Sequence, residues 1–67
     1  MDKNLFVKQF LKLTLMAADK AISDVTYMKS AAGEEYVTVK YHTGDVCRAL
    51  VTGDSCVALI KDVLEVL

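Results

Sequence analysis

The chain has 67 residues, of which 54% are hydrophobic and 25% charged, and its formal net charge at pH 7 is −1. A chain of this length makes one domain, so we expect residues 1–67 to fold as a single unit. So small a domain is marginally stable unless a disulfide, a metal or oligomerisation supports it, and the apolar content favours oligomerisation. The acidic balance argues against a general nucleic-acid binder, which carries a basic excess.

Cysteine usage and the apolar segments predict a location in the cytoplasm. The chain has two cysteines and no proline, and its N-terminus lacks the pattern of a signal peptide. The apolar stretch of residues 5–16 is interrupted by Lys8, Gln9 and Lys12, so it is too short and too polar to span a membrane. We therefore expect no membrane partner.

The first predicted element is a helix that begins at Asp2 or Asn4, either of which can cap it, and ends near Ala21. A period of 3.6 residues assigns one apolar face to this helix. The face consists of Phe6, Val7, Phe10, Leu11, Leu13, Ala17, Ala18 and Ala21. Leu5, Leu15 and Met16 fall in or beside the polar sector, so the helix has apolar surface to spare.

The middle of the chain changes to a period of two. Residues 25–30, 35–41 and 46–51 are rich in β-branched and aromatic side chains, which is typical of strands. The connections at residues 31–33 and 42–44 each have glycine in third place. This position suits a three-residue hairpin loop whose last residue is left-handed, so we predict a three-stranded antiparallel meander.

These loops determine the register of the strands. They place Val25 and Cys47 opposite Val39, and Tyr27 and Ala49 opposite Val37. One face of the sheet is then uniformly apolar, which a two-residue loop at Thr43-Gly44 would not produce. Its members are Val25, Tyr27, Val37, Val39, Tyr41, Cys47, Ala49 and Val51. At the end of the first hairpin, Lys29 lies opposite Glu35 and predicts a cross-strand ion pair.

The last predicted element is a helix over residues 56–67, capped by Asp54 or Ser55. Its apolar residues cover a sector of roughly 180°, wider than the stripe that one small domain buries. We expect the surplus to contact a second copy of the chain, through Leu59, Val63, Val66 and Leu67. The predicted fold is α+β, with the order helix, three-stranded meander, helix, in two layers and oligomeric.

The opposite face of the sheet is the candidate ligand site. It mixes apolar side chains with two cations, a histidine and an aromatic ring, the groups that hold a phosphate while the ring stacks on a base. The candidate residues are Tyr36, Thr38, Lys40, His42 and Arg48. The alternative is that this face only pairs with a second sheet, and the sequence leaves both open.

No catalytic or metal constellation is visible. His42, Cys47 and Cys56 match no closed zinc site, and the register turns His42 and Cys47 to opposite faces. Neither cysteine is beside the histidine as a nucleophile. We expect free thiols, no cofactor, no metal and no enzymatic activity.

The segments 33–41, 51–55 and 60–64, with Gly44, resemble those of short uncharacterised proteins from phages and mobile elements of Gram-positive bacteria. The resemblance carries no site residues. It implies a phage protein that counters host defence, for example by sequestering a cyclic nucleotide in a symmetric oligomer. Our prediction is a non-enzymatic homo-oligomeric binding module for an anionic small molecule. The alternatives are an inhibitor that binds a host defence enzyme and a small ribbon-type DNA-binding regulator.

Overall fold

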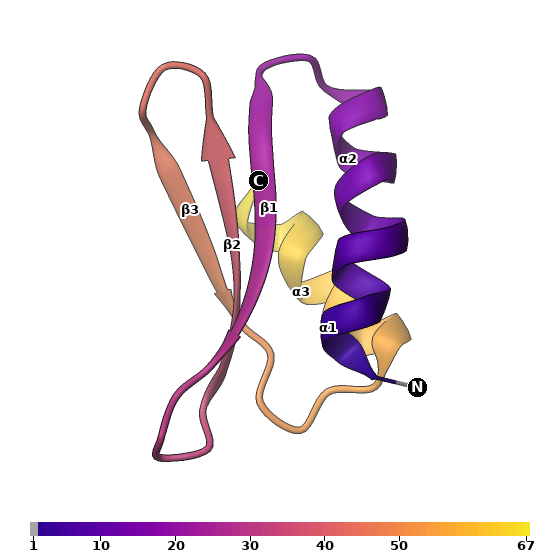
Figure 1. Cartoon of the computed structure of the whole chain (residues 1–67), viewed down its shortest axis with the longest axis vertical. Helices are drawn as coiled ribbons and strands as arrows, with labels where there is room; N and C mark the ends of the chain where they lie inside the picture. Colours follow the sequence, from indigo (N-terminus) through magenta and orange to yellow (C-terminus); the bar gives the residue numbers. More distant parts are fainter. Residues whose placement is uncertain (1) are drawn as a thin grey trace.

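A computed structural model describes residues 2–67 and confirms the α+β fold. The first helical region has three consecutive segments, α1 (Lys3–Phe6), η1 (Val7–Leu11) and α2 (Lys12–Ala18). Three antiparallel strands follow, β1 (Ile22–Lys29), β2 (Glu35–Tyr41) and β3 (Val46–Leu50), and α3 (Cys56–Val66) comes last. Figure 1 shows this order from the N-terminal helix, in indigo, to α3 in yellow.

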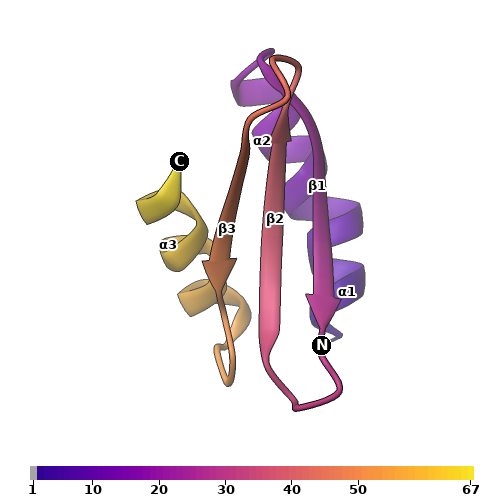
Figure 2. The same ribbon diagram turned by 90° about the vertical axis from the view of Figure 1, so that its left-hand side faces the viewer.

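Both helical regions cover the same face of the sheet. Figure 2 looks onto the other face and shows the strands in front, with the N-terminal helix behind β1 and α3 on the side of β3. The molecule therefore has two layers, as the sequence predicts. One face of the sheet is left without a helix, and we call it the outer face.

Side chains at the predicted positions begin the two helices. The Asp2 carboxylate accepts a hydrogen bond from the Asn4 N–H, and the Ser55 hydroxyl oxygen accepts one from the Ala58 N–H. The first helix ends at Ala18 rather than near Ala21, because Asp19 is extended and its carboxylate accepts from the Ala21 N–H. That early end lets β1 begin at Ile22, three residues before the predicted start.

The predicted register of the sheet is confirmed. Val39 lies between Val25 and Cys47, and Val37 lies between Tyr27 and Ala49. Both hairpin loops have three residues, and Gly33 and Gly44 have φ angles of 90° and 97°. These angles are in the left-handed region, which glycine adopts without strain.

The core lies between the sheet and the helices. Four strand residues, Val25, Val37, Val39 and Ala49, and Val51 just after β3 are members of the predicted apolar face, and each is at most 2% exposed. The helices add Val7, Leu11, Leu15, Leu59 and Val63, and Ile22 completes the cluster. The remaining predicted members of the sheet face, Tyr27, Tyr41 and Cys47, pack against this cluster while partly buried.

The predicted face of the first helix is partly wrong. Phe10 and Leu13 are more than half exposed, and Leu15, assigned to the polar sector, is buried. The cause is η1, a π-helical segment in which the Lys12 N–H bonds to the Val7 carbonyl, five residues back. Such a segment winds more loosely than 3.6 residues per turn, so residues four apart stay on one face. Val7, Leu11 and Leu15 therefore share the buried side.

Candidate binding surfaces

The outer face of the sheet is arranged in cross-strand rows. Met28, Tyr36 and Leu50 form one row, and Thr26, Thr38 and Arg48 form the next. A third row contains Asp24, Lys40 and Val46. Met28, Val46 and Leu50 are each more than half exposed. This face thus has an apolar row at one end and its two cations toward the other.

Tyr36 and Arg48 make direct contact on this face. They lie on neighbouring strands in adjacent rows, and the Arg48 guanidinium carbon is 5.6 Å from the centre of the Tyr36 ring. This distance is within the range of a cation–π interaction. The Tyr36 hydroxyl donates to the Glu34 carboxylate at 3.1 Å, and this bond raises the pKa of Tyr36. The Tyr36 side chain is therefore fixed by Arg48 over its ring and by Glu34 at its hydroxyl group.

The other predicted ligand residues do not all join this pair. Lys40 is exposed, but it is four residues along β2 from Tyr36, about 13 Å at the rise of a strand. His42 is in the β2–β3 loop, roughly 20 Å along the chain from Tyr36. Thr38 is only 7% exposed, so it lines the floor of the face. One small ligand on one chain reaches Tyr36 and Arg48 together, but not His42 as well.

The predicted oligomer interface on α3 needs correction. Leu59 and Val63 are fully buried in the core of the chain itself, so in this fold they face no second copy. Val66 and Leu67 are 37% and 45% exposed, and Val57 and Leu64 are more exposed than either. The outward surface of α3 is thus formed by Val57, Leu64, Val66 and Leu67.

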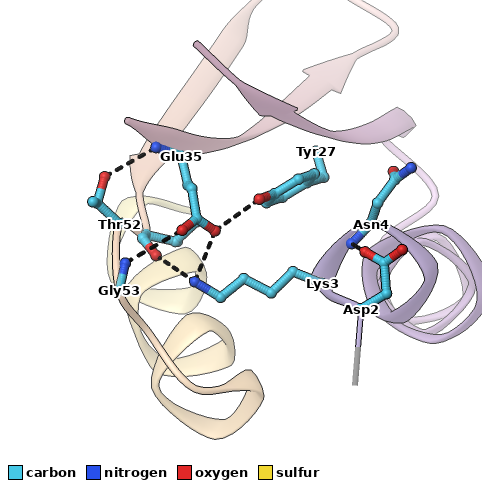
Figure 3. A network of polar contacts seen from close by, with 8 residues as sticks. Asp2, Lys3, Asn4, Tyr27, Glu35, Thr52 and Gly53 are labelled. Atoms are coloured by element: carbon cyan, nitrogen blue, oxygen red, sulfur yellow. Dashed lines mark hydrogen bonds and ion pairs between the residues drawn. The ribbon is translucent and has the colours of Figure 1, made fainter. Parts of the chain in front are cut away.

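A polar network that the sequence analysis missed joins the N-terminal helix to the sheet and to the loop before α3. The Lys3 ammonium lies 2.8 Å from a Glu35 carboxylate oxygen, which also accepts a hydrogen bond from the Tyr27 hydroxyl at 2.7 Å (Figure 3). Lys3 donates as well to the Val51 carbonyl, and the Gly53 N–H donates to Glu35. Lys29 is opposite Glu35 in register, as predicted, but the carboxylate pairs with Lys3 instead.

The network changes the acidity of its members. The bonds from Lys3 and Tyr27 lower the pKa of Glu35 to about 2. Desolvation, with the nearby Glu35 charge, raises the pKa of Tyr27 to about 12. Lys3 and Glu35 are mostly shielded from water. This arrangement is a structural clamp between elements, since every group in it has a partner inside the chain.

Two further carboxylates, those of Asp54 and Asp62, lie near this network. The neighbouring Asp62 carboxylate raises the pKa of Asp54, and desolvation adds to the effect. Oδ2 of Asp54 is buried without a hydrogen-bond partner among residues 2–67. Within the part of the chain that the structure describes, no group of three or more His, Cys, Asp or Glu residues is placed to hold a metal. Cys47 and Cys56 are free.

The comparisons with known proteins add no family. No family model, no curated protein and no solved structure matches the chain. In residues 2–67, no helix has the length and apolar character needed to cross a membrane.

Proposed function

We propose that the protein is a non-enzymatic, homo-oligomeric binding module whose outer sheet face binds a planar anionic ligand of the nucleotide class. Sequestration of a cyclic nucleotide, the role that the sequence resemblance implies, is the specific form of this proposal. The observation that carries it is the Arg48–Tyr36 pair on a face that no helix covers.

The chemistry of this pair suits such a ligand. A guanidinium over an aromatic ring keeps its N–H groups available at its edge, where they bind a phosphate in a bidentate manner. Met28 and Leu50 flank Tyr36 in the same row and offer an apolar surface to a base. Lys40 is in the row next to that of Arg48, so its long side chain can add a second cation to the same phosphate.

Self-association is supported by the amount of exposed apolar surface. Among residues 2–67, ten large apolar side chains are at least 37% exposed. They gather on the outer sheet face, on the outward surface of α3, and on the N-terminal helix at Leu5, Phe10 and Leu13. Contiguous exposed apolar surface marks interaction sites in small proteins.

The same exposure favours the second candidate function, which is inhibition of a partner protein through the outer face. Met28 and Leu50 on either side of Tyr36 make an apolar and aromatic row with Arg48 beside it. Aromatic residues, Met and Arg are the types enriched in protein–protein interfaces. A DNA-binding regulator is the weaker alternative, since Lys40 and Arg48 are the only basic residues in the three rows of this face.

Calorimetric titration of a panel of cyclic nucleotides tests the ligand. We expect heat with the wild-type protein, an affinity that falls with salt, and a loss of roughly 1.5–3 kcal/mol of binding free energy in Arg48→Ala. Lys61→Ala, which removes an exposed cation from α3, is the matched control and should bind as the wild type does. The absence of heat from every nucleotide would refute the ligand proposal.

Sedimentation tests the assembly. We expect an oligomer at micromolar concentration, and dissociation in Leu64→Asp, which places a charge on the outward surface of α3 without disturbing the core. A wild-type protein that sediments as a monomer would contradict self-association.

A further inference from the structure

The outer edge of β1 has backbone groups that no other strand uses. β1 is at the edge of the sheet, because the strand order is β1-β2-β3. The Ser30 N–H donates to the Glu34 carbonyl, and in an antiparallel ladder every second residue makes such bonds. By this alternation, the N–H and C=O groups of Val25, Tyr27 and Lys29 point away from β2. The Val25 N–H is indeed bound by the neighbouring Asp24 carboxylate at 2.9 Å.

A hollow of about 190 Å³ lies along this edge, between β1 and the N-terminal helix. Four consecutive strand residues, 24–27, line it. Side chains of a strand alternate between its two faces, so four consecutive residues can line one hollow only if the strand edge itself forms a wall. The opposite wall consists of Asn4, Val7, Lys8 and Lys12.

The hollow has a surplus of positive charge. Lys12 forms an ion pair with Asp24 at 3.0 Å, and Lys8 is exposed and makes no ion pair within residues 2–67. Two cations thus face one carboxylate. Asp24 already shows which group this edge binds, because its carboxylate accepts from the Val25 N–H and pairs with Lys12 at once. The bond to Lys12 lowers the pKa of Asp24, and the Val25 N–H contributes to the same shift.

The π-helical segment contributes to this arrangement. Lys8 and Lys12 both line the hollow, because residues four apart share one side of a helix. Isolated π-helical turns occur frequently at functional sites. In this chain the segment contributes Lys8 to the wall opposite the free strand edge.

We infer that this groove binds an extended acidic peptide from a partner protein, which adds to β1 as a fourth strand. Its backbone bonds to the Val25 carbonyl and to the free N–H and C=O groups of Tyr27 and Lys29, and its carboxylates pair with Lys8 and Lys12. The regular edge begins after the irregularity between Ile22 and Asp24 and ends at Lys29, which leaves room for about six residues. Strand addition gives affinity through the main chain and selectivity through alternate side chains.

The positive charge of the groove argues against a second copy of the chain as its binding partner. Pairing of two β1 edges around a twofold axis would bring both copies of Lys8 and Lys12 to one seam, against only two copies of Asp24. An acidic peptide neutralises the surplus instead. The groove is at the sheet edge and uses neither Arg48 nor Tyr36, so this inference and the proposed function fail independently.

The test is amide hydrogen exchange, followed by NMR, with two acetylated and amidated hexapeptides as probes. One alternates Glu with Val and the other alternates Lys with Val. With the Glu peptide, we expect exchange of the Tyr27 and Lys29 amides to slow by about tenfold or more, since these amides gain bonds. The Thr26 amide, which bonds to β2 already, is the internal control.

Two variants and one modified peptide complete the test. Lys8→Glu should weaken binding of the Glu peptide by about tenfold or more, because it removes a charge-assisted bond and adds repulsion. Lys61→Glu, the same change on α3, should leave it unaltered, as should Arg48→Ala. A Glu peptide N-methylated at the amides that face β1 should not bind.

Three results would overturn the inference. They are equal binding of the Lys peptide, no protection of Tyr27 and Lys29 at millimolar Glu peptide, and undiminished binding of the N-methylated peptide.

Discussion

The two faces of the sheet are built from the same three strands but have opposite environments. Val37 and Val39 on the inner face are fully buried, whereas Val46 and Leu50 on the outer face are more than half exposed. Glu35 and Tyr36 are consecutive residues, yet Glu35 joins a shielded network with Lys3 and Tyr36 lies under Arg48 on the bare face. Apolar character alone therefore does not decide burial here. The inner face gives the fold its stability, and the outer face is available for binding.

The largest expected effect is the difference in folding stability between substitutions on the buried and the outward side of α3. Leu59→Asp places a carboxylate in the core and should cost about 4 kcal/mol or more, comparable with the whole stability of so small a domain. Leu64→Asp, on the outward surface of the same helix, should leave the chain folded. Circular dichroism on heating checks both. An unfolded Leu64→Asp would mean that this surface is needed for folding.

A smaller effect separates the two faces of the sheet. Val39→Ala should cost roughly 1–3 kcal/mol, through lost burial and a cavity in the core. Val46→Ala removes the same atoms from the outer face and should cost less than about 0.5 kcal/mol. Urea unfolding at low protein concentration measures both. If the two costs were equal, something would cover the outer face in solution.

The sheet was predictable from the sequence because its signals are local. Alternation assigns Val37 and Val39 to one face, and Gly33 and Gly44 determine loop length and so register. The face of the N-terminal helix was not predictable with a period of 3.6, because the π-helical segment changes the winding between Val7 and Leu11. No residue in the sequence predicts a π-helical segment at Val7–Leu11.

The site was less predictable than the fold. Alternation correctly placed Tyr36, Lys40 and Arg48 on one face, but a shared face is not one site, since His42 lies roughly 20 Å along the chain from Tyr36. The bond between Lys3 and Glu35 joins residues 32 positions apart, and only the packing of the helix on the sheet brings them together. The strand register predicted Lys29 as the partner of Glu35, but in the folded chain Glu35 pairs with Lys3.

The third comparison is between neighbouring carboxylates of β2 and the loop before it. The pKa of Glu35 is lowered from 4.5 to about 2, so its ionised form stabilises the fold fully above pH 4.5, and this contribution disappears as the pH falls toward 2. Glu35→Gln should therefore lower the urea midpoint at pH 7, and the gap from the wild type should close between pH 4.5 and 2. Glu34→Gln, which loses only an exposed bond to Tyr36, should change the midpoint less. A gap for Glu35→Gln that is constant with pH would show that the charge is not the stabilising element.

The smallest expected effect concerns Asp54, whose carboxylate lies beside that of Asp62. Its ionised form destabilises the fold, whereas that of Glu35 stabilises it. The pKa of Asp54 is raised above 3.8 by the neighbouring Asp62 and by desolvation, which means that the fold favours its neutral form. The ionised group therefore destabilises the fold at neutral pH, and this cost disappears as the pH falls through the raised pKa toward 3.8. Asp54→Asn should raise the melting temperature at pH 7 and leave it nearly unchanged below pH 3.8. Asp62→Asn removes the neighbouring carboxylate, so a further Asp54→Asn in that background should raise the melting temperature less. A lower melting temperature for Asp54→Asn at pH 7 would show that the carboxylate serves the fold, in the same sense as Glu35.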